Sequence, residues 1–301
     1  METFDTPILL IIFNRPEKVK ILINSLSKIK PSRIYISADG PRKNIFGDEE
    51  KCNLAREAAK SIPWPCEIKT NFYQHNIGVA GGMEAAMSWF FSNVEEGIVL
   101  EDDCIPNDDC LPFIRSLLIK YRNDPRVMIV CGNNLQDGIQ RGHASYYFSN
   151  YHTWGYAMWK RTWNVFDAKL NGLDEFIKKR KIDSILEDPV QKKYWISFFK
   201  KIRSGKFNFT ETRLKFSVWN AGGVCIIPNV NLIKNIGFDN DSTHTFSVDK
   251  EKLSLETGEL KKIIHPDTMK INYEADDYYF YKKLKNTFFE KLRHKTKMWL
   301  K

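Results

Sequence analysis

The sequence predicts an α/β fold built on a mostly parallel sheet with helices on both faces. Apolar runs of strand length alternate with segments of helical period through the first half of the chain. Several of these runs end directly in a polar cluster. Because ligands of such sheets bind beyond the carboxyl ends of the strands, these clusters are where we expect the functional site.

The expected elements follow one another in a regular order. Residues 7–13 (PILLIIF) form an unbroken apolar run, as expected of a strand buried on both faces. Pro16 then suits a first helical position, where its missing N–H costs nothing. Further strands are expected at 33–38, 66–72, 97–100 and 127–131, and further helices around 55–59 and at 82–91 and 111–122.

The part of the chain after about residue 145 is richer in tryptophan and in helical patterns. We expect helices at 154–166 and 182–202, a short strand at 224–227 and a polar loop at 231–244. We therefore divide the chain into an α/β half (1–145), a helix-rich half of the same compact unit (146–278) and a basic amphipathic C-terminal helix (279–301).

The composition favours a folded cytosolic protein. Of its 301 residues, 43% are hydrophobic and 13% aromatic, enough for a substantial core. No apolar stretch reaches the roughly 20 residues of a membrane-spanning helix, and the N-terminus lacks the pattern of a signal peptide. The six cysteines form no C-x-x-C pair, so we interpret them as small buried apolar residues.

Residues 281–301 carry most of the net charge. They contain eight basic residues and one acidic residue, a net of +7 out of +9 for the whole chain. With apolar residues at helical spacing, such a segment can lie on an anionic membrane surface. The alternative is a solvated helix whose apolar stripe packs on the domain. No motif that recognises nucleic acid accompanies the charge, which disfavours a nucleic-acid partner.

The strongest local signal is Glu101-Asp102-Asp103, which directly follows the apolar run GIVL. Three adjacent carboxylates repel one another, and a divalent cation relieves that repulsion. Mg²⁺ or Mn²⁺ prefers oxygen ligands and commonly combines one or two carboxylates with substrate phosphates. The alternative is an acidic, solvated turn.

The order of the motifs resembles the donor site of GT-A glycosyltransferases. The segments that carry the resemblance are Asn14-Arg15-Pro16, 37–42 (SADGPR), 75–78 (HNIG), the acidic triplet, 154–159 (WGYAMW), 231–238 (NLIKNIGF) and 242–245 (STHT). Together they span about residues 7–245. They are most similar to bacterial nucleotide-diphospho-sugar transferases related to the N-acetylglucosaminyltransferase I group.

The resemblance implies a role for each donor-site residue. Asp39 would accept a hydrogen bond from the imide N–H of uracil, and Asn14, Arg15 and His75 would line the nucleotide pocket. Glu101 and Asp102 would face the donor sugar and ribose, and Asp103 would ligate Mn²⁺ or Mg²⁺. Each has a simpler alternative: Asp39-Gly40 is also a common turn dipeptide, Arg15 could be a surface charge, and His75 a loop residue.

The resemblance also implies a catalytic base and an acceptor side. Glu211 stands where relatives carry an aspartate, although the tryptophan that flanks the aspartate in relatives is absent here. The alternative for Glu211 is an acid in the first turn of a helix, which the helix dipole favours. Asp239 and Asp241 are the reserve candidates for the base, and His244 would bind metal or diphosphate. Trp154 and Gly155 would face the acceptor.

We therefore expect a transferase that moves a sugar from a UDP-sugar to an acceptor hydroxyl, with inversion and a divalent metal. The resemblance and the basic tail suggest a glycan or glycolipid acceptor in bacterial surface glycan assembly, at the inner face of the cytoplasmic membrane. The alternatives are a non-catalytic subunit with this fold and a sugar-phosphate nucleotidyltransferase. Nucleotidyltransferases carry a Gly-rich loop after the first strand, where this chain has Phe13-Asn14-Arg15.

Overall fold

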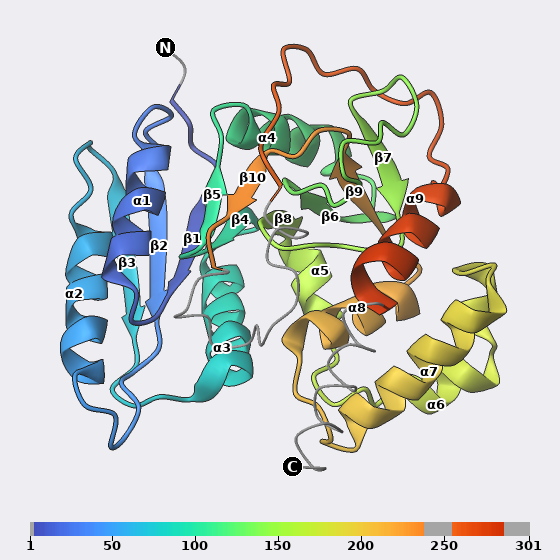
Figure 1. The fold of residues 1–301 in the computed structure, drawn as a ribbon, viewed down its shortest axis with the longest axis horizontal. Helices are drawn as coiled ribbons and strands as arrows, with labels where there is room; N and C mark the ends of the chain where they lie inside the picture. The colour runs from blue at the N-terminus through green and yellow to red at the C-terminus, as the bar shows by residue number, and fades with distance from the viewer. Residues whose placement is uncertain (1–2, 238–254, 286–301) are drawn as a thin grey trace, which may run out of the picture.

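The computed structural model describes residues 3–237 and 255–285, which fold around one eight-stranded sheet (Figure 1). The strands lie in the order β3-β2-β1-β4-β8-β6-β9-β7, and all but β7 and β8 run in the same direction. The strands are β1 (Ile8–Ile12), β2 (Arg33–Ala38), β3 (Glu67–Phe72), β4 (Glu96–Glu101), β6 (Val127–Cys131), β7 (Tyr146–Ser149), β8 (Tyr156–Trp159) and β9 (Val224–Pro228). The predicted α/β fold is confirmed.

Helices cover both faces of the sheet. The α-helices are α1 (Pro16–Leu26), α2 (Asp48–Lys60), α3 (Gly78–Asn93), α4 (Cys110–Tyr121), α5 (Lys160–Asn164), α6 (Leu173–Lys178), α7 (Pro189–Arg203), α8 (Thr210–Asn220) and α9 (Tyr273–Tyr278). Leu9 of β1 belongs to the core cluster that includes residues of α3, α7 and α8, whereas its neighbours Ile8 and Leu10 belong to the cluster that includes residues of α1, α2 and α4. Because alternate residues of a strand face opposite sides, this arrangement explains the unbroken apolar run at the start of the chain.

The expected helix at 154–166 is wrong in its first part. Residues Tyr156–Trp159 instead form β8, which lies antiparallel between β4 and β6, and only Lys160–Asn164 is helical. All four residues of β8 are buried, so the segment shows no alternation that would distinguish a strand from a helix by its period.

The expected helix at 182–202 is interrupted. It separates into the 3-10 helix η1 (Lys181–Ser184) and α7, which begins at Pro189. The side chain of Asp188 caps α7 by accepting a hydrogen bond from the backbone N–H of Val190 at 2.7 Å. Proline at the first position and an aspartate cap together fix this start.

A second, two-stranded sheet lies at the carboxyl end of β4. Strand β5 (Cys104–Pro106) directly follows the acidic triplet and pairs antiparallel with β10 (Ile233–Asn235). Part of the segment expected as a polar loop therefore carries a strand. This pairing brings residues 233–237 beside the triplet, from more than 120 positions further along the chain.

The proposed boundary at residue 279 falls within continuous helical structure, because α9 passes into the π-helix η3 (Tyr279–Lys285). Phe280 is fully buried against the core, and the buried Lys283 forms an ion pair with Asp137. The beginning of the basic segment thus packs on the domain. Within the residues that the structure describes, no helix is long and apolar enough to cross a membrane.

Candidate active site

A cavity of about 340 Å³ lies at the carboxyl ends of β1, β2 and β4. It is the place where ligands of parallel α/β sheets bind. Its wall includes five predicted donor-site residues and one predicted acceptor-side residue, namely Arg15, Asp39, Glu101, Asp102, Asp103 and Trp154. The structure thus brings together residues that are up to 139 positions apart in the sequence.

Arg15 joins the acidic triplet to the start of α1. Its Nε and Nη2 donate to the two carboxylate oxygens of Asp102, and its Nη1 donates to Oδ2 of Asp103 at 3.0 Å. Asp102 also accepts a hydrogen bond from the backbone N–H of Phe13 at 3.4 Å, and its side chain is 2% exposed. Asp102 therefore ties β4 to the β1–α1 connection, while Asp103 remains part of the cavity wall.

Burial and repulsion between the carboxylates shift Glu101 and Asp102 toward their neutral forms. Burial raises the pKa of Glu101 to about 8, with further contributions from Asp103, Glu211 and Asp102. Burial also raises the pKa of Asp102 to about 6, although Arg15 opposes this shift. The excess of negative charge at this point is what a cationic ligand would relieve.

Asp39 organises the connection between β3 and α3. Its carboxylate accepts four hydrogen bonds: from the backbone N–H groups of Gly40, Ile77 and Gly78 (2.7, 2.9 and 3.2 Å) and from the side chain of Asn76 (2.8 Å). A carboxylate has about four acceptor positions, so these contacts nearly fill them. To accept a hydrogen bond from a uracil imide, Asp39 would have to give up one of these four hydrogen bonds.

The turn at Gly40 brings two loops into direct contact. A Cβ at Gly40 would lie 2.4 Å from the backbone of His75, which no side chain could do without moving the loop. Glycine at this position therefore lets the connection between β3 and α3 reach Asp39. His75 itself is exposed and does not line the cavity, whereas its neighbour Asn76 does.

Asn14 and Arg42 meet at Asp48, the first residue of α2. Asn14 Nδ2 donates to Asp48 Oδ1 at 2.6 Å, and Arg42 donates to both oxygens of Asp48 through its side chain. These contacts, first of all the hydrogen bonds from Arg42, lower the pKa of Asp48 to about 2. Arg42 lines the cavity and Asn14 does not, so Asn14 supports the cavity wall from behind.

Glu211 lies in the first turn of α8. This turn rests on α3, because Thr210 Oγ1 donates to the carbonyl of Ala80 at 3.4 Å and Arg213 pairs with Glu84. The same end of α3 contributes Gly82 and Met83 to the cavity wall. Glu211 is 46% exposed, contributes to the raised pKa of Glu101, and bonds to Nε2 of His152 at 2.9 Å.

Gly155 has a positive φ of 63°, and a Cβ there would lie 2.2 Å from Cδ1 of Ile233. Both facts demand glycine, because side chains rarely adopt this backbone conformation and Ile233 occupies the space. Ile233 of β10 thus approaches the backbone of Gly155 closely. Trp154, immediately before it, lines the cavity.

Some predicted residues fall outside the cavity, and some cavity residues were missed. Asp239, Asp241 and His244 lie outside the described residues. The polar residues that the sequence analysis did not single out are Ser37, Arg42, Asn76 and Asn235. All four stand inside the segments that carry the family resemblance, so position within such a segment was the available signal.

The acids of the triplet provide oxygen ligands of the kind that Mg²⁺ and Mn²⁺ prefer. Asp102 and Asp103 both pair with the guanidinium of Arg15, and Glu101 adds a third carboxyl group to the same cavity, so the donor set is chemically suited to a further cation. Among the described residues, no group of three or more His, Cys, Asp or Glu side chains is arranged to hold a metal ion.

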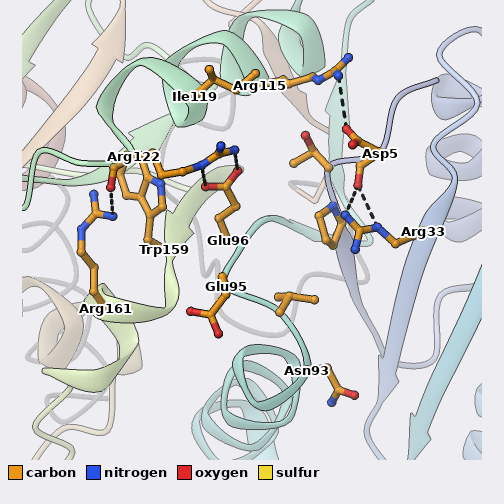
Figure 2. A pocket seen from close by; sticks show the side chains of 13 residues that line it. Asp5, Arg33, Asn93, Glu95, Glu96, Arg115, Ile119, Arg122, Trp159 and Arg161 are labelled. Atoms are coloured by element: carbon orange, nitrogen blue, oxygen red, sulfur yellow. Dashed lines mark hydrogen bonds and ion pairs between the residues drawn. The ribbon is translucent and has the colours of Figure 1, made fainter. Parts of the chain in front are cut away.

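A larger cavity, of about 780 Å³, lies at the opposite, amino-terminal ends of the parallel strands (Figure 2). Four arginines line it, but each is held within the protein. Arg33 and Arg115 bind Asp5, Arg122 binds Glu96, and Arg161 donates to backbone carbonyls. These contacts secure the edges of loops, so we place the chemistry in the smaller cavity.

No family model and no curated protein matches the chain. Solved structures with a similar arrangement include mouse xyloside xylosyltransferase 1 in its apo form (TM-score 0.37, 11% identity, 71% of this chain and 81% of that one). A UDP-glucose pyrophosphorylase complexed with UDP-glucose gives a TM-score of 0.34 at 10% identity over 54% and 78% of the two chains. The apo structure of the bifunctional glycosyltransferase WbbM gives 0.32 at 10% identity over 74% and 39%. Similarities this weak decide no function, which has to come from the site residues.

Proposed function

We propose that this protein transfers a sugar from a UDP-sugar to an acceptor hydroxyl group. The observation that carries the proposal is the acidic triplet at the end of β4, which shares one cavity with Asp39 and Arg15 at the carboxyl edge of a parallel sheet. The solved structures that the chain resembles weakly include two glycosyltransferases and a pyrophosphorylase.

On the donor side, Asp39 and Asn76 would bind the nucleobase. Both line the cavity, and the Asn76 amide already donates to Asp39 through its nitrogen, which leaves its oxygen for a base N–H. Glu101 and Asp102 would face the sugar and the ribose. Arg15 uses three of its nitrogens on the acids and retains further N–H donors for phosphate.

The chemistry of the triplet fits a divalent cation, Mn²⁺ or Mg²⁺, held by Asp103. Such an ion would neutralise part of the charge of the diphosphate leaving group.

On the acceptor side, Glu211 would act as general base. Its carboxylate takes the proton of the acceptor hydroxyl, whose oxygen bonds to the anomeric carbon as the bond from that carbon to the diphosphate breaks. The configuration at the anomeric carbon is inverted, UDP leaves, and the proton remains on Glu211. The exposed position of Glu211 beside the cavity wall suits an acceptor that arrives from solvent.

The first test measures UDP binding by thermal shift and calorimetry with and without Mn²⁺. With UDP present at 100 times its dissociation constant, the wild-type protein should gain about 2.7 kcal/mol of stability. Asp103→Ala should lose the manganese-dependent part and keep its fold. Asp108→Ala, an exposed acid in the connection from β5 to α4, is the matched control and should bind as wild type does. Wild type that binds no UDP with manganese would contradict the proposal and favour a non-catalytic subunit.

The second test concerns the base. Glu211→Gln should bind UDP normally and lose transfer by about 10²-fold or more, because a general base typically contributes 10²–10⁴-fold. The control is Glu175→Gln, another acid in a first helical turn. Full transfer by Glu211→Gln would place the base elsewhere.

The nucleotidyltransferase alternative predicts a different product. Its enzymes would form UTP from a UDP-sugar and pyrophosphate, whereas a transferase releases UDP. The β1–α1 connection of this chain, Phe13-Asn14-Arg15, is short and passes into a helix that begins with proline. A glycan or glycolipid acceptor, with residues 281–301 near an anionic membrane, remains part of the proposal and is tested by sedimentation with anionic liposomes.

A further inference from the structure

The carboxylate of Glu211 is held by a histidine that the protein encloses. His152 is 4% exposed and lies in the connection between β7 and β8. Its Nε2 lies 2.9 Å from Oε2 of Glu211. Its Nδ1 is buried without a hydrogen-bond partner in the described part of the chain. His152 cannot reach an acceptor itself, so any effect on transfer has to pass through Glu211.

The two contacts of the imidazole define its protonation. An ionised carboxylate only accepts hydrogen bonds, so Nε2 must carry the hydrogen that lies between them. Nδ1 has no partner in either state, but a second proton there would also charge the ring inside the protein, and burying a charge costs more than burying an unpaired acceptor. The ring is then neutral, with one donor directed at Glu211.

A buried lysine on the same helix face favours this neutral ring. Lys215 stands four residues after Glu211 on α8 and is 5% exposed. Its Nζ lies 4.7 Å from the ring centre of Tyr151 and 5.2 Å from that of Trp195. Within the described residues it forms no ion pair with a carboxylate. Burial, and next the charge of Lys215, lower the pKa of His152, although Glu211 opposes this shift.

We propose that His152 is a positioning residue for the catalytic base. Its neutral Nε2–H fixes Oε2 of Glu211, stabilises the ionised carboxylate and leaves Oε1 for the proton of the acceptor hydroxyl. Lys215 keeps the imidazole neutral, because a second proton on His152 would convert the pair into an ion pair and weaken the base. The proposal rests on the proposed function.

Several titratable groups interact with the charge of Glu211. They are Glu101, Cys131, His152, Tyr156, Lys215 and Tyr279. Burial brings the pKa values of Glu101 and Lys215 to about 8, so both groups change charge near neutrality. An effect of His152 must therefore be separated from theirs by comparing variants at the same pH.

The experiment compares His152→Phe, which removes the donor, with His152→Gln, which restores an N–H group. Both should bind UDP as wild type does. His152→Phe should lose about ten-fold or more in kcat with the donor KM unchanged, because the carboxylate is no longer held in place. His152→Gln should recover most of kcat. Wild-type kcat in His152→Phe would overturn the proposal.

A measurement on the wild-type protein separates this proposal from the proposed function. Nitrogen-15 NMR of labelled histidine should show a neutral His152 with its hydrogen on Nε2 at pH 7, and that signal should shift in Glu211→Gln. An imidazolium, or a hydrogen on Nδ1, would overturn the positioning role even if the folding of His152→Phe were impaired. Absence of sugar transfer by wild type would contradict the proposed function alone.

Discussion

At the scale of single residues, the candidate site is unusual for the charge it buries. Asp102 is 1% exposed and Lys215 is 5% exposed, and neither lies at a surface where water would stabilise its charge. Asp102 has Arg15 as its partner, whereas Lys215 lies between aromatic rings. Buried charges usually cost stability, so the burial of both groups supports a functional role for them.

Lys215→Met should therefore stabilise the fold and impair transfer. Replacing a buried charge by an apolar side chain of similar length is expected to add on the order of 1–3 kcal/mol to the free energy of unfolding at pH 7. Burial lowers the pKa of Lys215 to about 8, below the usual value near 10.4 of an unfolded chain. Between these values the unfolded state binds more protons, so the contribution of Lys215 to stability rises with pH there.

Urea unfolding of both proteins from pH 7 to 10 measures this effect. The advantage of Lys215→Met should shrink as the pH rises through about 8. Lys193→Met, an exposed lysine of α7, is the control and should change stability little at any pH. A Lys215→Met protein that is less stable than wild type at pH 7 would show that the ammonium group is stabilised by its surroundings.

At the scale of elements, helices α3 and α8 and the β7–β8 connection bring the two sides of the site together. Helix α3 carries cavity residues at its start and supports the first turn of α8, which presents Glu211. The β7–β8 connection supplies His152 from one side and Trp154 from the other. Glu211 is thus held by packing between elements distant in sequence, and its placement depends on the position of the β7–β8 connection.

Helix α9 fastens this connection through Asp276. The buried carboxyl group accepts a hydrogen bond from Ser149 Oγ. It also accepts one from the backbone N–H and one from the side-chain N–H of Asn150, each at 3.0 Å. Asp276→Ala leaves these donors without their acceptor and should lower the free energy of unfolding by about 1–3 kcal/mol. Glu274→Ala, whose side chain is 89% exposed on the same helix, is the control, and urea unfolding is the measurement.

The loss caused by Asp276→Ala should depend on pH. Burial raises the pKa of Asp276 to about 7, above the value near 3.9 of an unfolded chain. Between these values the folded state binds more protons, so the stability that Asp276 contributes falls as the pH rises. The difference between wild type and Asp276→Ala should be larger at pH 5 than at pH 8. The opposite trend would mean that the carboxylate is ionised when buried.

At the scale of the whole molecule, one sheet unites both halves of the chain. Strands β7 and β8, from the second half, pair with β9, β4 and β6, so the division near residue 145 does not separate two sheets. The two ends of this sheet differ in character. The carboxyl end collects unbalanced acids around a cavity, whereas the arginines at the amino end are bound within the protein (Figure 2). Only the first suits a cationic or diphosphate ligand.

The sequence by itself determined the first sheet strands, most of their helices and the position of the acidic triplet. These elements follow from local patterns: buried strands such as Ile8–Ile12 are continuous apolar runs, and α1 begins at a proline with apolar residues at helical spacing. Strand-end placement then predicted that Arg15, Asp39 and Glu101-Asp102-Asp103 would share a cavity, because parallel strands end at one edge. What these residues bind stays a prediction.

Only the tertiary structure decided the rest. The segment YAMW is a strand because it lies between β4 and β6, a partnership that no local period encodes. The same holds for His152, a lone histidine whose sequence neighbours say nothing of Glu211, 59 positions away. The role proposed for His152 arises from contact between distant elements, where a buried imidazole meets the carboxylate of Glu211.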